Sequence, residues 1–205
     1  FGIAPVEPEI DFQAVKAHIQ GVIDQIAPVD SVERYSGFGV TVLTEDARFE
    51  DEQTIVSDSH RVRAKRIVVA AGSRAAAPSI PGLADVPYLT NETIFQVPTL
   101  PKHLLIIGSG PIGLEMGQSF RRLGSKVTII DIAEPLGGAD PDHAKLLIDA
   151  LRAEGVDFRA PAKTKLISKT ARTIKIEFED GKAVTGSHLL VAAGRTPNVD
   201  GLDLE

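Results

Sequence analysis

The chain of 205 residues contains no cysteine. Without a thiol it forms no disulfide, binds no metal through thiolate and performs no thiol catalysis. This absence is typical of a cytoplasmic chain, which is the location we expect. The five histidines are scattered and show no metal-ligand spacing, so we expect no metal site and solvated surface positions for all five.

Long apolar runs and an excess of positive charge are also missing. No apolar run approaches the ~18 residues that a membrane-spanning helix needs, and no signal peptide is visible. The net charge of −6 at pH 7 argues against nucleic acid or an anionic membrane as a partner. The chain starts at Phe1 rather than at a methionine and ends at Glu205, just past an expected loop, so we expect a piece of a longer protein.

The most informative segment that is present follows residue 103. Residues 104–107 are an apolar run typical of a buried parallel strand, and a Gly-x-Gly-x-x-Gly turn and an expected helix come directly after it. A second apolar run, residues 126–130, then ends on the acid Asp131. This order predicts a dinucleotide-binding βαβ unit.

Each glycine of the turn is expected to have its own task. Gly108 allows a sharp turn off the strand, Gly110 leaves room for a pyrophosphate, and Gly113 lets the helix pack closely on the sheet. Pro111 suits the first helical position, where a missing N–H costs nothing. The free N–H groups and the dipole of the helix start then favour a phosphate anion.

The acid after the second strand predicts which nucleotide is bound. Asp131 follows Gly108 by 23 positions, near the roughly 20 expected for the carboxylate that accepts from the ribose hydroxyls. Ile132 and Ala133 come next, so no arginine or lysine stands beside Asp131 to hold a 2′-phosphate. The sequence therefore predicts NAD rather than NADP.

The first half of the chain is expected to contain one helix and a small meander. Residues 11–26 have helical apolar spacing, with Asp11 as N-cap. The β-branched runs of residues 32–66 predict an antiparallel meander, and residues 67–71 predict a buried strand. Residues 73–102 hold five prolines and predict an extended connector.

The second half is expected to alternate strands and helices. Strands are predicted at 103–107, 126–131, 156–159, 164–169, 173–179, 183–187 and 189–193, and helices at 111–123 and 141–154. This order predicts an α/β fold, a Rossmann-like domain with a parallel sheet, helices and a β-meander. The runs 68–74 and 190–195 are alike, since each reaches a glycine and then a basic residue. Each of these glycines either ends a strand or marks a ligand-binding turn, and both readings stay open.

Four features together resemble the flavin- and pyridine-nucleotide-dependent disulfide oxidoreductases, closest to the branch of dihydrolipoamide dehydrogenase and mercuric reductase. They are the segments 70–74, 108–115 and 194–198 and the residue Asp131. The resemblance implies an NAD-binding domain joined to a partial FAD-binding domain. It divides the chain into a late portion of the first FAD-domain segment (1–97), the NAD-binding domain (98–193) and the return toward the FAD domain (194–205).

The resemblance also implies the cofactors and the activity of the parent protein. NAD and FAD would pass electrons to or from a dithiol/disulfide couple, and the parent would be a homodimer. The first FAD fingerprint, the redox cysteine pair, the acid/base histidine and the dimerisation domain of that family have no counterpart in this sequence. We therefore nominate no catalytic residue, and expect this piece mainly to bind NAD.

Some family roles transfer by position. Gly194 and Arg195 would lie beside the nicotinamide end, and Gly72 and Ser73 near FAD. Glu115 matches a glutamate near the flavin that pairs with a lysine, although an acid in the first turns of a helix also complements the helix dipole. The complete set of expected cofactor contacts is Gly72, Ser73, Gly108, Ser109, Gly110, Pro111, Ile112, Gly113, Glu115, Asp131, Ile132, Gly194 and Arg195.

The sequence departs from the family pattern in two places. Many relatives have an aromatic gate over the nicotinamide pocket where this chain has Pro111, so the gate would have to be Ile112 or be absent. Ala71 stands where the family usually has a threonine, and Ala75 and Ala76 disrupt the usual Arg-Pro step. Both departures weaken the expected FAD contacts.

Two other functions remain open. One is a non-thiol flavoprotein of the same two-dinucleotide fold, such as an NADH oxidase or a ferredoxin-reductase-like enzyme. The other is a binding module that kept the fold and lost catalysis. A Cys-x4-Cys pair upstream of this piece would favour the disulfide reading over the first of these. A full-length protein unable to reduce any acceptor with NADH and FAD would favour the second.

Overall fold

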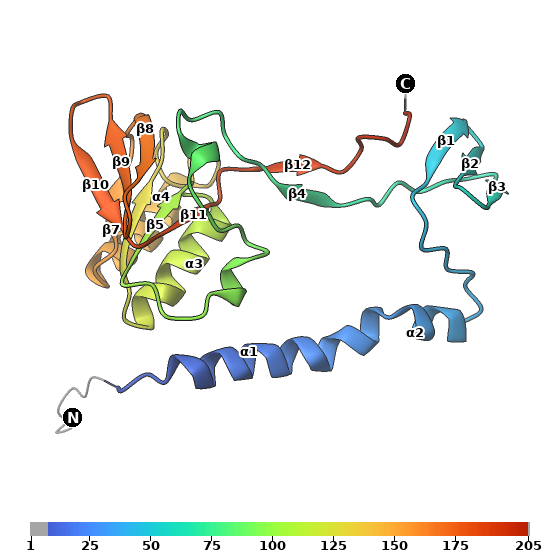
Figure 1. The fold of residues 1–205 in the computed structure, drawn as a ribbon, viewed down its shortest axis with the longest axis horizontal. Coiled ribbons are helices and arrows are strands. Elements are labelled where there is room, and N and C mark those ends of the chain that lie inside the picture. The colour runs from blue at the N-terminus through green and yellow to red at the C-terminus, as the bar shows by residue number, and fades with distance from the viewer. Residues whose placement is uncertain (1–7, 205) are drawn as a thin grey trace. The chain divides into compact units, whose positions relative to one another are not determined.

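The computed structural model describes residues 8–204, so the start at Phe1 and the end at Glu205 lie outside it. The chain forms two compact units (Figure 1). Unit 1 contains Ala75–Gly194 and the residues up to Lys16, and unit 2 contains Ala17–Arg74 and the residues from Arg195 onward. Among the described residues, none of the helices is long and apolar enough to cross a bilayer.

Unit 1 is built on a parallel sheet of four strands in the order β11-β5-β6-β7. The strands are β5 (His103–Ile107), β6 (Lys126–Ile130), β7 (Asp157–Arg159) and β11 (His188–Val191). Helix α3 (Pro111–Arg122) joins β5 to β6, and α4 (Pro141–Ala153) joins β6 to β7. These two βαβ crossovers confirm the predicted α/β fold with a Rossmann-like parallel sheet.

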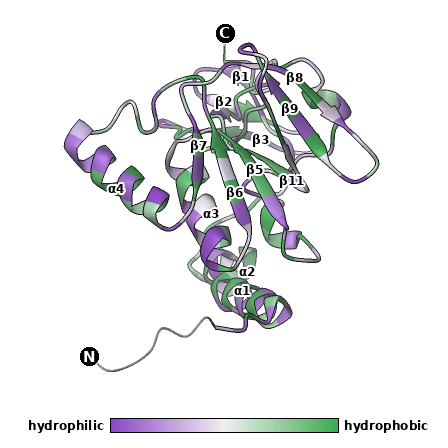
Figure 2. Ribbon diagram, turned by 90° about the vertical axis from the view of Figure 1, so that its left-hand side faces the viewer, coloured by the Kyte–Doolittle hydropathy of each residue, from purple (hydrophilic) through white to green (hydrophobic). Residues whose placement is uncertain are grey.

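The two faces of this sheet pack against different layers. Alternate residues of β5 point to opposite faces, so Leu104 and Ile106 join the cluster that includes Phe120 of α3 and Leu151 of α4. The other face packs against a three-stranded antiparallel meander. The meander strands are β8 (Thr164–Lys169), β9 (Ile174–Phe178) and β10 (Ala183–Gly186). Because both of its faces are covered, β5 is apolar along most of its length, as Figure 2 shows in green.

The proline-rich segment 73–102 is less extended than predicted. It contains two short 3₁₀ helices, η2 (Leu83–Asp85) and η3 (Ile94–Gln96). Between them Leu89 forms a parallel bridge to Leu190 at the edge of the sheet. The prediction was wrong because apolar residues between the prolines, such as Leu83 and Ile94, are buried in the two clusters of unit 1.

The predicted first helix is confirmed as α1 (Phe12–Ile26), and the side chain of Asp11 accepts hydrogen bonds from the N–H groups of Gln13 and Ala14. The predicted meander begins later than expected. Unit 2 contains η1 (Ala27–Asp30), α2 (Val32–Gly37), and the antiparallel strands β1 (Arg48–Asp51), β2 (Thr54–Val56) and β3 (Arg61–Arg63). The start of the expected meander is helical because Ser31 caps α2, accepting from the N–H of Arg34 at 3.2 Å.

The predicted strand 67–71 does not form. These residues carry no regular secondary structure, and Val68 keeps 86% of its surface exposed. Pairing begins only after Gly72, where β4 (Ser73–Ala75) pairs with β12 (Arg195–Pro197), a strand that the sequence did not predict. An apolar run needs a neighbouring strand to satisfy its backbone groups, and among the described residues no strand pairs with 67–71.

Candidate functional site

The glycine-rich turn between β5 and α3 is the first candidate site. Gly108 has φ of +108°, and a Cβ there would lie 2.3 Å from the carbonyl oxygen of Ala192. Its N–H donates to the carbonyl of Ile130 at 2.8 Å, which joins the turn to the end of β6. Both the left-handed backbone and the close approach require glycine at this position.

Two further glycines set how closely α3 lies on the turn and the sheet. A Cβ on Gly113 would lie 2.0 Å from the carbonyl oxygen of Gly108, and one on Gly117 would lie 2.8 Å from Cδ1 of Ile129. Gly117 was not among the predicted residues. Its signal was the spacing of four from Gly113, which places both glycines on one helix face.

Gly110 has a different environment from its neighbours. Its backbone is extended, with φ −76° and ψ −177°, and a Cβ there would meet no atom within 4 Å. Pro111 occupies the first turn of α3, as predicted. Gly110 is the N-cap of α3. The first N–H groups of a helix have no partner within the helix, and such free donors can bind a phosphate.

Asp131 follows β6 directly and lies beside this turn. Its Oδ2 accepts from both the N–H and the hydroxyl of Ser109, each at 2.7 Å, and its Oδ1 accepts from the N–H of Ala133 at 3.0 Å. Partial burial raises the pKa of the Asp131 carboxyl. Hydrogen bonds from the N–H of Ala133, from Ser109 and from the N–H of Ile132 outweigh that effect, so the pKa lies below its usual range. Asp131 is therefore a carboxylate at neutral pH.

The remaining predicted residues of unit 1 lie at or near the same turn but make fewer contacts. Ile132 is 68% exposed directly after Asp131. Ile112 is half-buried and Glu115 is exposed. Within the described residues, no hydrogen bond or ion pair involves the Glu115 carboxylate, so both readings of this residue stay open. Gly194, the last residue of unit 1, has φ of +134° and accepts from the N–H of Ala76 through its carbonyl at 3.0 Å.

A second group of predicted residues lies in unit 2. Arg195 donates through Nε to the hydroxyl of Ser73 at 2.7 Å and through its guanidinium to the Ser73 carbonyl. Asn198 donates to the carbonyls of Gly72 and Ala71, at 3.0 and 3.1 Å. Gly72 has φ of +68° and ends no strand in this structure. The turn at Gly72 is instead held in place by the hydrogen bonds from Arg195 and Asn198. These contacts were not predicted from the sequence.

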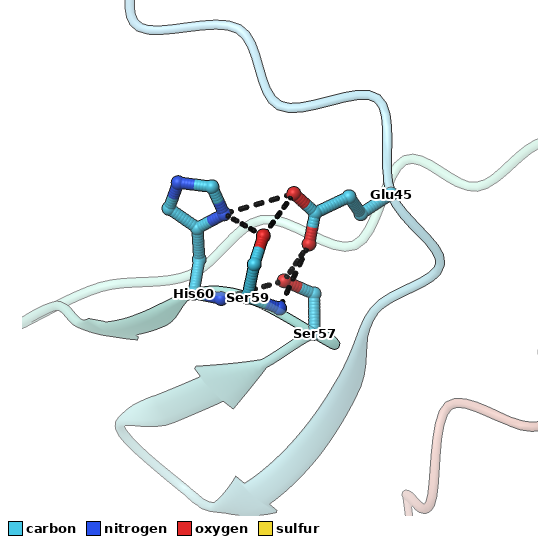
Figure 3. A network of polar contacts seen from close by, with 4 residues as sticks. All are labelled: Glu45, Ser57, Ser59 and His60. Atoms are coloured by element: carbon cyan, nitrogen blue, oxygen red, sulfur yellow. Dashed lines mark hydrogen bonds and ion pairs between the residues drawn. The ribbon is translucent and has the colours of Figure 1, made fainter.

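Figure 3 shows a polar network in unit 2 that combines serine, histidine and glutamate. Glu45 accepts from the hydroxyls of Ser57 and Ser59, at 2.5 and 2.6 Å, and lies 2.9 Å from Nδ1 of His60. A catalytic triad needs the serine and the acid on opposite ring nitrogens, yet Ser59 also contacts Nδ1, at 3.0 Å. The network therefore anchors the loop around Glu45 to the β2–β3 turn and is not arranged for nucleophilic catalysis.

Two histidines are less solvated than predicted. His103 and His188, at the starts of β5 and β11, are half-buried. Nε2 of His103 lies 2.9 Å from the hydroxyl of Thr128 on β6. Burial lowers the pKa of both imidazoles below the usual range. Their position in adjacent strands of a two-sided sheet buries them, which a lone histidine in a sequence does not reveal. In the part of the chain described, no three metal-ligating side chains form a metal-binding group.

The chain is similar to known proteins in sequence and in structure. The family model described as pyridine nucleotide-disulphide oxidoreductase matches residues 8–205. Mercuric reductase of Bacillus cereus is 33% identical over 171 residues, which are 82% of this chain and 27% of that protein. Mercuric reductase of Shigella flexneri is 33% identical over 221 residues, covering 100% of this chain and 38% of that protein.

A glutathione reductase of Nostoc sp. is 34% identical over 170 residues, 82% of this chain and 37% of that protein. Among solved structures, the HOCl-induced flavoprotein disulfide reductase RclA from Escherichia coli matches with a TM-score of 0.80 and 26% identity. That match covers 95% of this chain and 45% of RclA. The chain thus spans less than half the length of each of these proteins.

Proposed function

The chain belongs to the pyridine nucleotide-disulphide oxidoreductase family, and from that premise we propose that it supplies the NAD-binding part of a flavin-dependent oxidoreductase. The parent protein would pass electrons between NAD(H) and a dithiol/disulfide through FAD. Relatives named mercuric reductase, glutathione reductase and disulfide reductase favour this reading over a non-thiol flavoprotein or a non-catalytic module. With no cysteine in the chain, the thiol step belongs to residues outside it.

The open space at Gly110 is the observation that carries the proposal. It lies at the N-terminus of α3, and no neighbouring atom fills the volume of a Cβ there. The pyrophosphate of a dinucleotide fits such a site because backbone N–H groups and the helix dipole stabilise negative charge. When bound, NAD and FAD supply the hydride and electron chemistry, and this chain's residues bind and orient them.

NAD is preferred to NADP in this proposal. The pKa of Asp131 lies below its usual range, and among the described residues no cation contributes to that shift. Its carboxylate would accept from ribose hydroxyls and repel a 2′-phosphate. Ile132, mostly exposed next to it, offers apolar surface for the adenine ring. Gly72, Ser73, Gly194 and Arg195 are proposed contacts of the other ends of the two cofactors.

A glycine substitution tests the phosphate site. Gly110→Ala has no steric obstacle in the protein, so its thermal unfolding midpoint should match that of the wild-type chain. Its methyl group would occupy the space proposed for the pyrophosphate, and we expect NADH binding, followed by nucleotide fluorescence, to weaken at least tenfold. Gly21→Ala is the matched control, since Gly21 also meets no atom within 4 Å.

Two results would contradict the proposal. Equal NADH affinity in Gly110→Ala and wild type would rule out this turn as the phosphate site. Equal affinity of the wild-type chain for NADH and NADPH would rule out the nucleotide preference assigned to Asp131.

A further inference from the structure

Ser109 is the first variable residue of the glycine-rich turn. Its N–H, hydroxyl and carbonyl all form hydrogen bonds with the segment that follows β6. Its N–H and hydroxyl both donate to Oδ2 of Asp131 at 2.7 Å, and its carbonyl accepts from the N–H of Leu136 at 3.3 Å. Ser109 is only 1% exposed. The backbone conformation of a glycine-rich turn does not require a hydroxyl at this position. The Ser109 hydroxyl therefore has a role other than forming the turn.

The donors around Asp131 determine which of its oxygens remains available. A carboxylate oxygen has two acceptor sites. Ser109 donates twice to Oδ2, whereas the one donor with a full hydrogen bond to Oδ1 is the N–H of Ala133. The N–H of Ile132 also lowers the pKa of the carboxylate, more weakly than Ala133 and Ser109 do. Oδ1 is therefore the oxygen with fewer protein donors and the one that we assign to a ligand. The two serine bonds, together with the bond from Ala133, fix the rotation of the carboxylate.

The serine hydroxyl is the one side-chain donor to Asp131 among the described residues. The other donors are backbone N–H groups, and no lysine or arginine lies within ion-pair distance of the carboxylate there. Neutral hydrogen-bond donors stabilise the ionised carboxylate without cancelling its negative charge, as a lysine or arginine would. The charge of Asp131 therefore remains available to repel a 2′-phosphate.

We propose that Ser109 is a positioning residue for nucleotide selection, which fixes Asp131 so that Oδ1 meets a ribose hydroxyl and a 2′-phosphate is excluded. This inference rests on the proposed function and gives Ser109 a role that it performs through Asp131. The backbone links of the turn, from the N–H of Ser109 to Asp131 and from Leu136 to Ser109, do not depend on the hydroxyl. A variant without the hydroxyl is therefore expected to fold.

The test compares Ser109→Ala with Ser125→Ala. Ser125 is an equally good stability control because it is also 1% exposed and its hydroxyl donates one 2.7 Å bond, to the carbonyl of Pro101, away from the turn. Both variants should lower the unfolding midpoint by similar amounts. NADH affinity should fall about tenfold in Ser109→Ala, the effect of one hydrogen bond to a charged group. The preference for NADH over NADPH should shrink with it.

Two further measurements separate positioning from a general structural effect. In a background of Asp131→Asn, removing the Ser109 hydroxyl should cause no further loss of NADH affinity, because the serine acts through the carboxylate. In the wild-type chain, ¹³C NMR of the Asp131 carboxyl should report a lower pKa than in Ser109→Ala, and the same pKa as in Ser125→Ala.

The outcomes distinguish this inference from the function on which it rests. A wild-type chain that binds no NADH overturns both. A wild-type chain that binds NADH, with equal affinities in the two serine variants, overturns the role of Ser109 alone. An Asp131 pKa unchanged in Ser109→Ala also overturns it.

Discussion

Residues 67–71 and 189–193 have nearly the same sequence, Ile-Val-Val-Ala-Ala and Leu-Leu-Val-Ala-Ala, but different structures. The second run contains most of β11, which pairs with β5 and buries Leu190 completely. The first forms no strand and leaves Val68 86% exposed. An apolar run therefore becomes a strand only where neighbouring strands and covering layers exist.

The same contrast separates the two units. Every hydrophobic side chain that is fully buried in residues 8–204 belongs to unit 1. In unit 2, as far as the structure describes it, Thr54 is the one buried residue. Its helical region leaves a series of apolar side chains exposed: Val22, Ile23, Ile26, Val29, Val32, Tyr35 and Phe38. Unit 1 is therefore stabilised by its core, and unit 2 mainly by hydrogen bonds and ion pairs between exposed groups.

The largest effect should come from truncating equivalent residues of the two runs. Leu190→Ala removes a fully buried side chain from the helix-facing core and should lower the free energy of unfolding by about 2–5 kcal/mol. Val68→Ala removes a mostly exposed side chain and should change it by less than about 0.5 kcal/mol. Urea unfolding of both variants measures the difference, and similar losses would contradict the contrast between the runs.

A smaller effect should come from the two N-cap aspartates. Asp140 accepts from the N–H groups of Asp142 and His143 at the start of α4, which buries Ile148 and Leu151. Asp140→Ala should therefore cost unit 1 about 1 kcal/mol in urea unfolding.

Asp11 caps α1 in the same way, but α1 has no buried residue and meets the core through the partly buried Phe12. Asp11→Ala should reduce helicity, measured by far-UV circular dichroism, and shift the unfolding midpoint of unit 1 less than Asp140→Ala does. Equal shifts of that midpoint in the two variants would contradict this ranking of the two caps.

The smallest effect should come from titration, because the groups are partly exposed and water screens them. Burial lowers the pKa of His103 and His188 in the folded state, so the unfolded chain binds more protons below its usual histidine pKa of 6.5. The stability of unit 1 should therefore decrease as the pH falls through 6.5. Urea midpoints at pH 7.5 and 5.5 test this, and His103→Gln should reduce the difference.

Unit 2 should respond at lower pH. Hydrogen bonds from Ser57 and Ser59 lower the pKa of Glu45 from 4.5 to about 2. The stabilisation is present above the unfolded value and is lost as the pH falls from about 4.5 toward 2. Glu45→Gln should abolish this acid transition. An acid transition of unit 2 that persists in Glu45→Gln would contradict this role of the Glu45 carboxylate.

The sequence predicted the parts of the molecule that local rules determine. The βαβ order around Gly108, the start of α3 at Pro111 and the cap at Asp11 all follow from residue types at fixed spacing. The family was predicted as well, because the segment 194–198 and the glycine fingerprint are informative together.

The errors occurred where tertiary contacts outweigh local preference. The run 67–71 has strand propensity but no partner strand. Leu89, in the proline-rich segment, pairs with Leu190 of β11 although the sequence predicts no strand there. The hydrogen bond from the Ser109 hydroxyl to Asp131 depends on the distance between the ends of β5 and β6, which no spacing along the chain reveals. The contacts proposed for the nucleotides stay predictions.

The position of β11 has a consequence for synthesis of the protein. This strand lies next to β5, and Ser187 just before it bonds to His103, 84 residues earlier in the chain. Because Leu189 and Leu190 belong to opposite cores, neither core is complete until β11 has left the ribosome. Until β11 is synthesised, the edge of β5 that pairs with it has no partner strand. Unit 1 should therefore fold late in translation and cooperatively.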